Sequence, residues 1–565
     1  MKKKIMPVLI AIVLIIIIGG VSFGTKIVEK YSYTKERADL NAYYEMSGES
    51  DVAIVLQDEI IEERARLFDG VYYLDLSTVH KYFNDRFYED KGEGLLLYTI
   101  PDDIIRTVIG SSEMTDKDGT KALAYIPARY EGETLYLAID YVKMYTNFSY
   151  EGFTEPDRLQ IYTQWNERQV ASIKKDTAVR VLGGVKSEIL EDLKAGDKVV
   201  VLEQMETWSK VKTADSVIGY VENKRLENIR AELPIPVTDY AEPEYTSVKR
   251  DHKINMGWHV IAGEAGNDTL AEVTANTKGL NVISPTWFKV SDNEGNFTSF
   301  ASSSYVEKAH DMGMEVWGLV ENIEYKDSLD MYAILSSTTI RAKLIEGLVN
   351  EALACGMDGI NVDFEQISTD CGEHFIQFIR ELSIPCRQNG LVLSIDNYVP
   401  MGGTDHYDRE EQGIVADYVI IMGYDEHYAG SAEAGSVASI DFVEEGIKQT
   451  VEEVPADKVI NAIPFYTRIW ETSDEGVSSQ AVGMDMAEEY VRTHNIQVEW
   501  DDETCQNYGE YTQDDVIHQV WLEDDSSIEV KLNIMDKYQV AGVASWRLGF
   551  EKPEIWNVIE AYQNR

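Results

Sequence analysis

Residues 251–565 alternate short apolar stretches with helical stretches, and this repeat constrains the fold more than any other feature of the chain. Helical patterns over 338–355 and 372–383 lie between consecutive apolar stretches. A strand that alternates with a helix builds a parallel sheet, and eight such units close into a barrel. We therefore expect an α/β protein with a (β/α)8 TIM barrel over residues 249–565. The predicted strands are 254–260, 279–285, 315–320, 359–365, 391–397, 418–425, 459–466 and 542–547.

The fourth predicted strand, within residues 358–365, reads D-G-I-N-V-D-F-E and carries polar side chains on one face. Because side chains alternate along a strand, Asn361, Asp363 and Glu365 face one way and their apolar neighbours face the other. Same-face neighbours lie about 6.6 Å apart, so two carboxyl groups there do not ionise independently. The more buried acid keeps its proton near neutral pH, as a general acid does. The alternative is a buried strand whose acids pair with arginine or bind a metal.

Residues 358–365 resemble the signature D-G-x-D-x-D-x-E of glycoside hydrolase family 18, whose fold is a TIM barrel. M-G-Y-D at 422–425 resembles the family's M-x-Y-D on strand six, and Trp546 matches its tryptophan on strand eight. Residues 471–525 interrupt the seventh unit, where the family often carries an inserted α+β piece. The stretch 520–532 is similar to a bacterial subgroup that acts on spore or vegetative peptidoglycan.

Asn361 departs from this family, which usually has Asp at that position. An amide cannot share a proton with Asp363 as a carboxylic acid can. The resemblance therefore implies a slower reaction or a shifted pH dependence, and it leaves open a barrel that binds sugar without cleaving it. Retention of Glu365 argues against that non-catalytic alternative.

The resemblance implies a substrate-assisted reaction, in which the N-acetyl oxygen of the sugar attacks its own anomeric carbon. Glu365 would protonate the leaving glycosidic oxygen and then activate water. Asp363 would orient the acetamide and stabilise the oxazolinium ion, and Tyr424 would hydrogen-bond the same acetamide. The reaction needs no cofactor and no metal. Further candidates for substrate binding are Asn361, Asp358, Met422, Asp425, Trp546, Trp258, Tyr466 and Arg468.

The substrate must carry a 2-acetamido group, because the nucleophile of this reaction belongs to the sugar. Peptidoglycan, chitin and the cores of N-glycans all meet that condition. We expect an extracellular N-acetylglucosaminidase that acts on peptidoglycan. Chitinase and glycan endo-N-acetylglucosaminidase activities are the alternatives that keep catalysis.

The N-terminus carries a membrane signal. Three lysines at residues 2–4 precede an uncharged apolar run over residues 5–23. That length suits one helix across a bilayer, with the lysines in the cytoplasm and the remainder of the chain outside the cell. We therefore expect a single-pass anchor at residues 1–24 and a stalk at 25–50. A secreted chain with a cleaved signal peptide is the alternative, although no A-x-A site follows the run.

Two modules are expected between the stalk and the barrel. Residues 51–165 have an α+β pattern and are similar to the copper amine oxidase N-terminal-like domain, a name that implies no copper here. Residues 166–228 resemble a bacterial SH3 domain, a small β-barrel of a kind that often binds cell-wall peptides. Residues 229–248 contain three prolines and predict a stiff linker. The runs expected as strands are 71–76, 122–127 and 135–142 in the first module and 178–182, 198–202, 208–211 and 219–221 in the second.

Composition excludes some partners. The formal net charge of −48 argues against nucleic acid, because phosphate binding needs clustered Lys and Arg. The four cysteines fall late in the chain without a C-x-x-C pair, which predicts neither a zinc site nor a disulfide scaffold and leaves room for one or two bridges outside the cell. They are Cys355, Cys371, Cys386 and Cys505.

Overall fold

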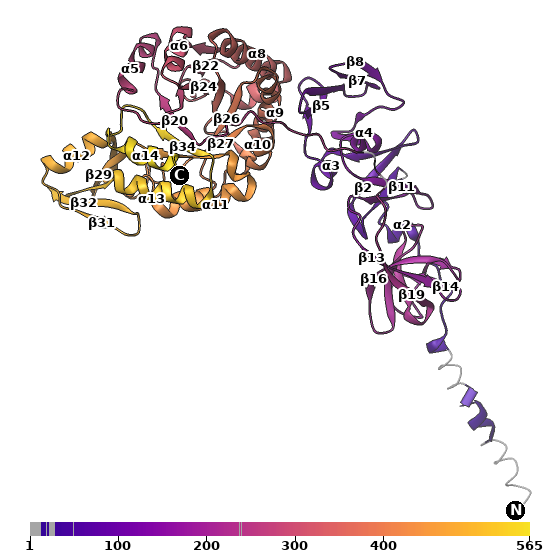
Figure 1. Ribbon diagram of the computed structural model, residues 1–565. Helices are drawn as coiled ribbons and strands as arrows, with labels where there is room; N and C mark the ends of the chain where they lie inside the picture. Colours follow the sequence, from indigo (N-terminus) through magenta and orange to yellow (C-terminus); the bar gives the residue numbers. More distant parts are fainter. Residues whose placement is uncertain (1–12, 19, 22–28, 49, 237, 239) are drawn as a thin grey trace, which may run out of the picture. The chain divides into compact units, whose positions relative to one another are not determined.

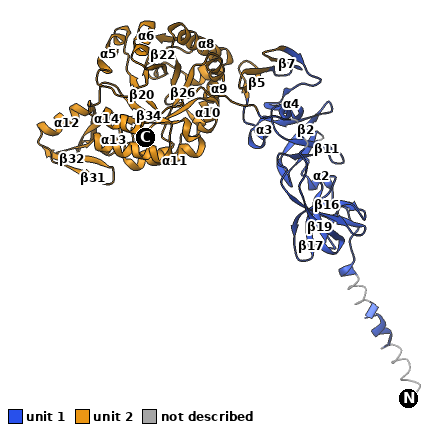
Figure 2. Ribbon diagram, viewed as in Figure 1, with its two compact units in different colours: residues 1–87, 107–114, 120–242 blue, residues 88–106, 115–119, 243–565 orange. Residues whose placement is uncertain are grey.

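The structure is a computed structural model (Figure 1), and it describes residues 13–18, 20–21, 29–48, 50–236, 238 and 240–565. The chain divides into two compact units, which Figure 2 colours separately. Unit 1 consists of residues 1–87, 107–114 and 120–242, and unit 2 consists of residues 88–106, 115–119 and 243–565.

Unit 1 begins with a seven-stranded sheet in the order β11-β12-β1-β2-β3-β10-β9. β3 matches the predicted run at 71–76, and β10 with the helix α4 (Ile139–Met144) accounts for 135–142. The strand expected at 122–127 is wrong: only Ala122 belongs to a strand, β8 (Gly119–Ala122), and residues 123–127 connect β8 to β9. The strands of this sheet are β1 (Asp51–Leu56), β2 (Glu59–Phe68), β3 (Val71–Asp75), β9 (Ala128–Glu131), β10 (Thr134–Ala138), β11 (Ser149–Phe153) and β12 (Arg158–Tyr162).

A second seven-stranded sheet of unit 1 has the order β15-β14-β18-β17-β16-β13-β19. All four strands predicted for the SH3-like module are present, as β14, β16, β17 and β18. Val179, Val199, Val211 and Val221, one from each of these strands, meet in its core. The strands are β13 (Arg168–Ile173), β14 (Thr177–Arg180), β15 (Ile189–Leu193), β16 (Lys198–Gln204), β17 (Trp208–Lys212), β18 (Ile218–Glu222) and β19 (Leu226–Glu232).

Unit 2 contains the predicted barrel. Eight parallel strands follow one another in the order β21-β20-β34-β28-β27-β26-β25-β24, and pairing of β21 with β24 closes the ring within residues 240–565. Each of the eight predicted strands is confirmed. They are β20 (Ile254–His259), β21 (Val282–Pro285), β24 (Glu315–Glu321), β25 (Gly359–Asp363), β26 (Val392–Tyr398), β27 (Tyr418–Met422), β28 (Val459–Pro464) and β34 (Gly542–Trp546).

Helices connect the barrel strands, and the sequence signals at their ends explain where they stop. The predicted helix at 338–355 is α8 (Thr338–Cys355), which starts after the capping hydroxyl of Ser337 and ends at Gly356, with φ +74°. The predicted helix at 372–383 is α9 (Gly372–Asn389) and extends one and a half turns beyond the prediction. The others named here are α7 (Met331–Ser336), α10 (Arg409–Val415), α11 (Ile440–Glu453), α13 (Asp525–Tyr538) and α14 (Ile555–Gln563).

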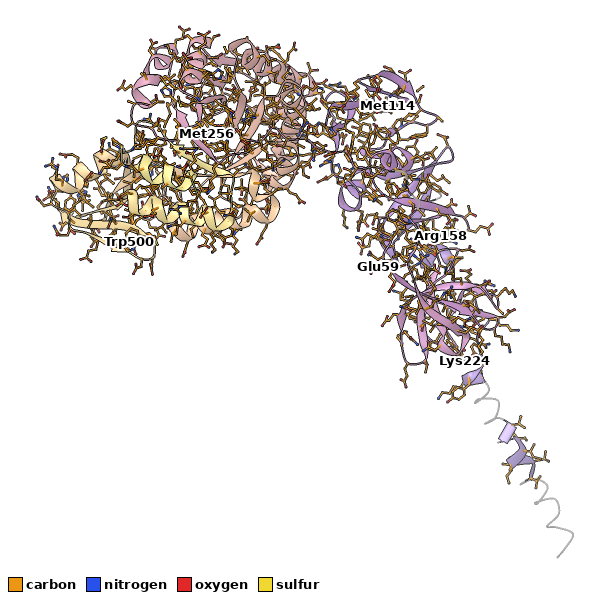
Figure 3. The ribbon with its side chains drawn as sticks, viewed as in Figure 1. Glu59, Met114, Arg158, Lys224, Met256 and Trp500 are labelled. Carbon is orange, nitrogen blue, oxygen red and sulfur yellow. The ribbon has the colours of Figure 1, made fainter. Side chains whose placement is uncertain are left out.

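The insertion expected at 471–525 is an α+β piece, as the family resemblance implied. It is a five-stranded antiparallel sheet in the order β30-β29-β33-β32-β31, with α12 (Met484–Thr493) in contact with β29, β30 and β33. Trp500, on β31, is exposed in this piece (Figure 3). The strands are β29 (Tyr466–Ser473), β30 (Gly476–Gly483), β31 (Val498–Asp501), β32 (Gln506–Gln513) and β33 (Val516–Leu522).

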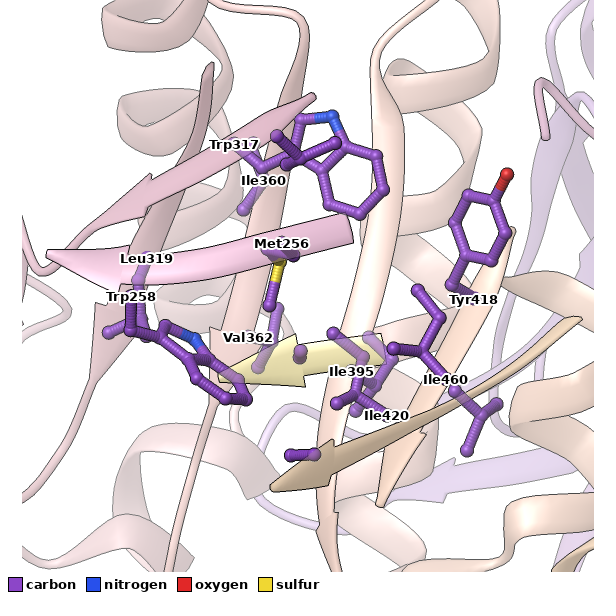
Figure 4. Packing of buried hydrophobic residues seen from close by; sticks show 14 of the residues in the cluster. Met256, Trp258, Trp317, Leu319, Ile360, Val362, Ile395, Tyr418, Ile420 and Ile460 are labelled. Atoms are coloured by element: carbon purple, nitrogen blue, oxygen red, sulfur yellow. The ribbon is translucent and has the colours of Figure 1, made fainter. Parts of the chain in front are cut away.

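Large side chains fill the barrel interior (Figure 4). Trp317 on β24 stacks on Tyr418 at the start of β27, with ring centroids 5.5 Å apart and planes 20° apart. Met256 and Trp258 belong to the same buried cluster. The interior is therefore packed with large side chains below the C-terminal strand ends, where barrel enzymes place their sites.

A hairpin from the N-terminal half of the chain belongs to the barrel unit. It comprises β4 (Phe87–Asp90) and β5 (Leu95–Ile100). The carboxylate of Asp90 accepts hydrogen bonds from the backbone N–H (2.7 Å) and the hydroxyl (2.6 Å) of Thr338, at the start of α8. Glu93 accepts the N–H of Thr339 at 2.7 Å. Residues distant in sequence thus cap a barrel helix.

The predicted anchor at 1–24 lies largely outside the described residues and stays a prediction. In the part of the chain that the structure describes, no helix has both the length and the apolar character required to cross a bilayer. Each of the four cysteines is a free thiol.

Candidate active site

Glu365 lies two residues beyond β25, at the C-terminal end of the barrel. Its Oε2 accepts a 2.7 Å hydrogen bond from the hydroxyl of Tyr398, the last residue of β26. On the other side, Asn322 follows β24 and bonds both the backbone N–H and the backbone carbonyl of Glu365, each at 2.9 Å. The two neighbouring strands therefore hold the main chain and the carboxyl group of Glu365 at the barrel mouth.

Burial raises the pKa of Glu365 above its usual value. The negative charges of Asp425 and Glu321 raise this pKa further, whereas the hydrogen bond from Tyr398 and the charge of Lys326 lower it. The result is a carboxyl group that keeps its proton to a higher pH than an exposed glutamate. Such a group can give a proton to a leaving oxygen and later take one from water.

Asp363, the last residue of β25, presents an unpaired acceptor. Its Oδ1 is buried and has no hydrogen-bond partner among the described residues. Burial raises the pKa of Asp363 well above its usual value, and the charges of Asp396, Glu365 and Glu321 add to that rise. A buried acceptor without a hydrogen-bond partner is unfavourable by about 1–3 kcal/mol. A ligand N–H that donates to this oxygen removes that penalty, which favours binding.

Asn361 lies two residues before Asp363 on β25 and is completely buried. Its Oδ1 accepts hydrogen bonds from the indole N–H of Trp258 at 2.9 Å and from the hydroxyl of Ser284 at 3.1 Å. Its amide nitrogen donates to Oδ1 of Asp396 at 2.9 Å. Asn361 thus connects β20, β21 and β26 and lies beneath the site, not on its open surface.

Tyr424 and its neighbours come from the end of β27, where Met422 is the last strand residue. Tyr424 is 9% exposed, and its pKa is raised by burial and then by the charge of Asp363. Its ring meets that of Tyr466 edge to face, with centroids 6.1 Å apart. The hydroxyl of Tyr466 donates to Oδ1 of Asp425. Tyr424 is therefore near enough to Asp363 to be affected by its charge, and Tyr466 contacts both Tyr424 and Asp425.

Two tryptophans lie side by side at the ends of the first and last barrel strands. The rings of Trp258 and Trp546 have centroids 5.8 Å apart and planes 64° apart. Trp258 is fully buried and its indole N–H is taken by Asn361, whereas Trp546 is partly exposed. Trp546 is the ring available to a ligand, and Trp258 supports it from below.

Arg468 and Asp358 are placed differently from the other predicted residues. Arg468 lies on β29 of the insertion, where its guanidinium donates to the hydroxyl of Ser479 at 3.1 Å, and its charge lowers the pKa of Tyr466. Asp358 precedes β25, at the opposite end of the barrel. Its Oδ2 accepts from the ring of His310 and from the N–H of Val316, both at 2.8 Å. The prediction that Asp358 binds substrate is therefore corrected: its hydrogen bonds hold residues together at the end of the barrel away from Glu365.

Five residues of this site were not predicted from the sequence. A signal was present for two of them, because S-I-D-N-Y over 394–398 alternates polar side chains toward the barrel interior, and the predicted strand ended one residue too early to include Tyr398. Glu321 and Asn322 directly follow a predicted strand, where barrel sites gather. The residues missed are Ser284, Glu321, Asn322, Asp396 and Tyr398.

Two proteins of Bacillus subtilis are similar in sequence to part of this chain. The putative sporulation-specific glycosylase YdhD of Bacillus subtilis (strain 168) is 30% identical over 226 residues, which cover 39% of this chain and 53% of that protein. The cortical fragment-lytic enzyme of the same organism is 26% identical over 246 residues, covering 42% of this chain and 57% of that protein. The chain thus spans little more than half the length of these two relatives.

A solved structure shares the fold. The chitinase from Chromobacterium violaceum ATCC 12472 superimposes with a TM-score of 0.50 and 22% identity, over 55% of this chain and 99% of that one. The sequence also matches two families, Glycosyl hydrolases family 18 at residues 288–551 and Bacterial SH3 domain at residues 168–227. The resemblance of residues 51–165 to the copper amine oxidase N-terminal-like domain stays a prediction. The chain therefore carries a glycosyl hydrolase family 18 domain, preceded by a bacterial SH3 domain.

Proposed function

We propose that this protein is a retaining glycoside hydrolase that cleaves β-1,4 bonds after N-acetylglucosamine in peptidoglycan. The observation that carries the proposal is the pairing of two carboxyl groups with different environments. Oδ1 of Asp363 is buried and has no hydrogen-bond partner in the described part of the chain. Glu365, two residues further on, accepts a hydrogen bond from Tyr398 and keeps its proton to a raised pH. Asp363 can accept the N–H of a 2-acetamido group, and Glu365 beside it can donate a proton to the glycosidic oxygen, so the pair fits a sugar with that group.

In the first step Glu365 gives its proton to the glycosidic oxygen as the bond to the anomeric carbon breaks. The carbonyl oxygen of the sugar's own acetamide forms the new bond to that carbon, which leaves a positively charged oxazolinium ion. Asp363 accepts the acetamide N–H and stabilises the positive charge. Tyr424, which lies close enough for its pKa to respond to Asp363, donates its O–H to the same acetamide.

In the second step the carboxylate of Glu365 takes a proton from a water molecule, whose oxygen attacks the anomeric carbon. The bond to the acetamide oxygen breaks, and the sugar leaves with its original configuration, because two inversions have occurred. Trp546 supports the sugar ring from below through its apolar face. No residue of the protein forms a covalent bond to the sugar.

Peptidoglycan is favoured over chitin by the other domains and by the relatives. One relative is named for sporulation and the other for the lysis of cortical fragments, and a bacterial SH3 domain precedes the barrel. Chitin and glycoprotein glycans carry the same acetamide and are the competing substrates. The proposed location, outside the cell and anchored at residues 1–24, rests on the sequence alone; cell fractionation with the full-length chain tests it.

Incubation of the full-length protein with purified peptidoglycan and, separately, with chito-oligosaccharides tests the activity. We expect new reducing-end N-acetylglucosamine from peptidoglycan, read by mass spectrometry, and none with the Glu365→Gln variant. Glu529→Gln, an exposed change of the same chemistry on α13, is the matched control and should leave the products unchanged. Binding of either polymer without cleavage would instead support a sugar-binding barrel, and cleavage of chito-oligosaccharides alone would support a chitinase.

A further inference from the structure

Three acids lie side by side across neighbouring parallel strands at the rim of the barrel. Glu321 on β24 is the register partner of Asp363 on β25. On the other side, Val362 of β25 pairs with Ile395 of β26, so the next residue pair along these two strands is Asp363 and Asp396. Adjacent strands are about 4.8 Å apart, so these carboxyl groups belong to one electrostatic cluster.

Asp396 is held in this cluster by a fixed amide. The Oδ1 of Asn361 already accepts from Trp258 and Ser284, and this settles which end of the amide faces Asp396. The amide nitrogen therefore donates to Oδ1 of Asp396, at 2.9 Å. Asp396 is 3% exposed, so its carboxyl group meets protein and not bulk water. Asn361 can make this hydrogen bond whether Asp396 is ionised or carries a proton on its other oxygen.

The surroundings of the pair supply mainly negative charge. Burial raises the pKa of Asp396 well above its usual value, and Glu365 raises it further, while the bond from Asn361 lowers it. Burial and Asp396 are the two largest causes of the raised pKa of Asp363. Other ionisable groups among the described residues interact with these acids or with Glu365. They are Glu321, Tyr398, Tyr407, Tyr424, Asp425 and the exposed cation Lys326.

We propose that Asp396 is the second carboxyl group of this site, which Asn361 holds beside Asp363 so that the two acids share one proton at neutral pH. The family signature has an acid at position 361, and here that acid has moved to the neighbouring strand, with an amide in its former place. Asp396 does not touch the sugar and acts through Asp363 as a positioning residue.

The consequence for the reaction rests on the proposed function. The pair carries one negative charge throughout, and the position of its proton decides whether that charge lies on Asp363. When positive charge develops on the acetamide, the anion of Asp363 with the proton on Asp396 is the favoured arrangement. The negative charge therefore shifts onto Asp363 as the transition state forms, whereas before that it is shared with Asp396.

Infrared spectroscopy of the full-length protein at pH 7 tests the shared proton without any substrate. Protonated carboxyl groups have a C=O stretch that carboxylates lack. We expect the difference between the wild type and Asp396→Asn to show loss of one protonated carboxyl, and the same loss for Asp363→Asn, because the remaining acid ionises. Asp327→Asn, an exposed change in the loop after β24, is the control and should leave the C=O band of protonated carboxyl groups unchanged. An unchanged carboxyl signal in Asp396→Asn would overturn the proposal.

Kinetics on chito-oligosaccharides or peptidoglycan test the role in the reaction. In Asp396→Asn the charge on Asp363 is present before the substrate arrives, so we expect kcat to fall about tenfold while KM does not rise. The acid limb of the pH profile should move up by about one pH unit, because the proton that Asp396 shares with the anion of Asp363, and that favours this anion in the wild type, is gone. A merely structural role would raise KM or lower the melting temperature and leave the pH limb in place.

The double variant Asn361→Asp/Asp396→Asn returns the acid to its position in the family signature. It should recover most of the lost kcat and the wild-type acid limb, and failure to recover either would count against a shared proton. If the wild type cleaves neither polymer, the proposed hydrolase function fails. The infrared measurement then still decides whether the two acids share a proton.

Discussion

The hydroxyl of Tyr398 donates a 2.7 Å hydrogen bond to Oε2 of Glu365, across two adjacent strands of the barrel. The bond favours the ionised form of Glu365 and fixes its rotamer. It thus works against burial, which raises the pKa of the same carboxyl group. These two opposing effects on the pKa of Glu365 suit a group that must first donate a proton and then accept one.

Tyr398→Phe removes that donor and should lower kcat/KM about tenfold, the effect of one hydrogen bond to a charged group. The pKa of Glu365 should rise further, because the interaction that lowered it is gone. Glu365 then keeps its proton to a higher pH, and the basic limb of the pH profile moves upward. Initial rates between pH 4 and pH 9 measure both effects, and Tyr325→Phe on an exposed loop is the control. A basic limb that stays in place would contradict the assignment.

Asp363→Asn should abolish cleavage and yet stabilise the barrel at neutral pH by about 1 kcal/mol, as removal of strain at functional sites often does. Burial raises the folded-state pKa of Asp363 above its unfolded value. A raised folded pKa gives stability that is present below the unfolded pKa and is lost as the pH rises through the folded pKa. The gain from the amide should therefore vanish near pH 4. Thermal unfolding at pH 7 and pH 4 measures this difference, and an equal gain at both values would exclude the explanation.

Arg341→Met should destabilise unit 2 by about 3–5 kcal/mol, because it leaves Glu381 buried without a counter-charge. The two side chains are 0% and 3% exposed and approach to 2.8 Å. The Arg341 guanidinium also donates to the hydroxyl of Tyr88 at 3.1 Å. Denaturant unfolding measures the change. Lys343→Met removes an exposed charge from the same helix and should have an effect under about 0.5 kcal/mol; equal effects of the two variants would refute the role of burial.

Gly542→Ala should destabilise the barrel by about 1–3 kcal/mol, the usual effect of overpacking. A Cβ at this position would lie 2.2 Å from the backbone oxygen of Ile254 on the adjacent strand β20, and a backbone atom cannot yield as a side chain can. Gly263→Ala is the matched control, since nothing lies within 4 Å of its added Cβ. Unfolding curves of the two variants decide the matter, and a stable Gly542→Ala protein would show that β20 and β34 are not packed so closely.

The barrel strands could be predicted because each is a local pattern, with apolar residues that alternate or run together between helical stretches. The alternation of polar and apolar residues at a strand end pointed to Asp363 and Glu365 in the same way, whereas Tyr424 was predicted from the resemblance of residues 422–425 to the family motif. The run 122–127 was misread because its hydrophobicity suits a strand, although residues 123–127 form the connection between β8 and β9.

Contacts between strands far apart in the sequence could not be predicted in this way. The bond between Asn361 and Asp396 joins residues 35 positions apart and depends on the register of β25 against β26. Asp358 was assigned to the site because it stands in the motif, although its position before the strand directs it to the other end of the barrel. A motif gives residue types in order, and only the closed sheet decides which of them meet.

The hairpin that places Asp90 and Glu93 at the start of α8 also bears on any attempt to transplant the catalytic half of this protein. The proline-containing stretch at 229–248 is an obvious place to divide the chain, but a fragment that begins there would lack both carboxylates that accept N–H groups at the start of α8. We therefore expect a portable barrel to need residues 88–106 as well.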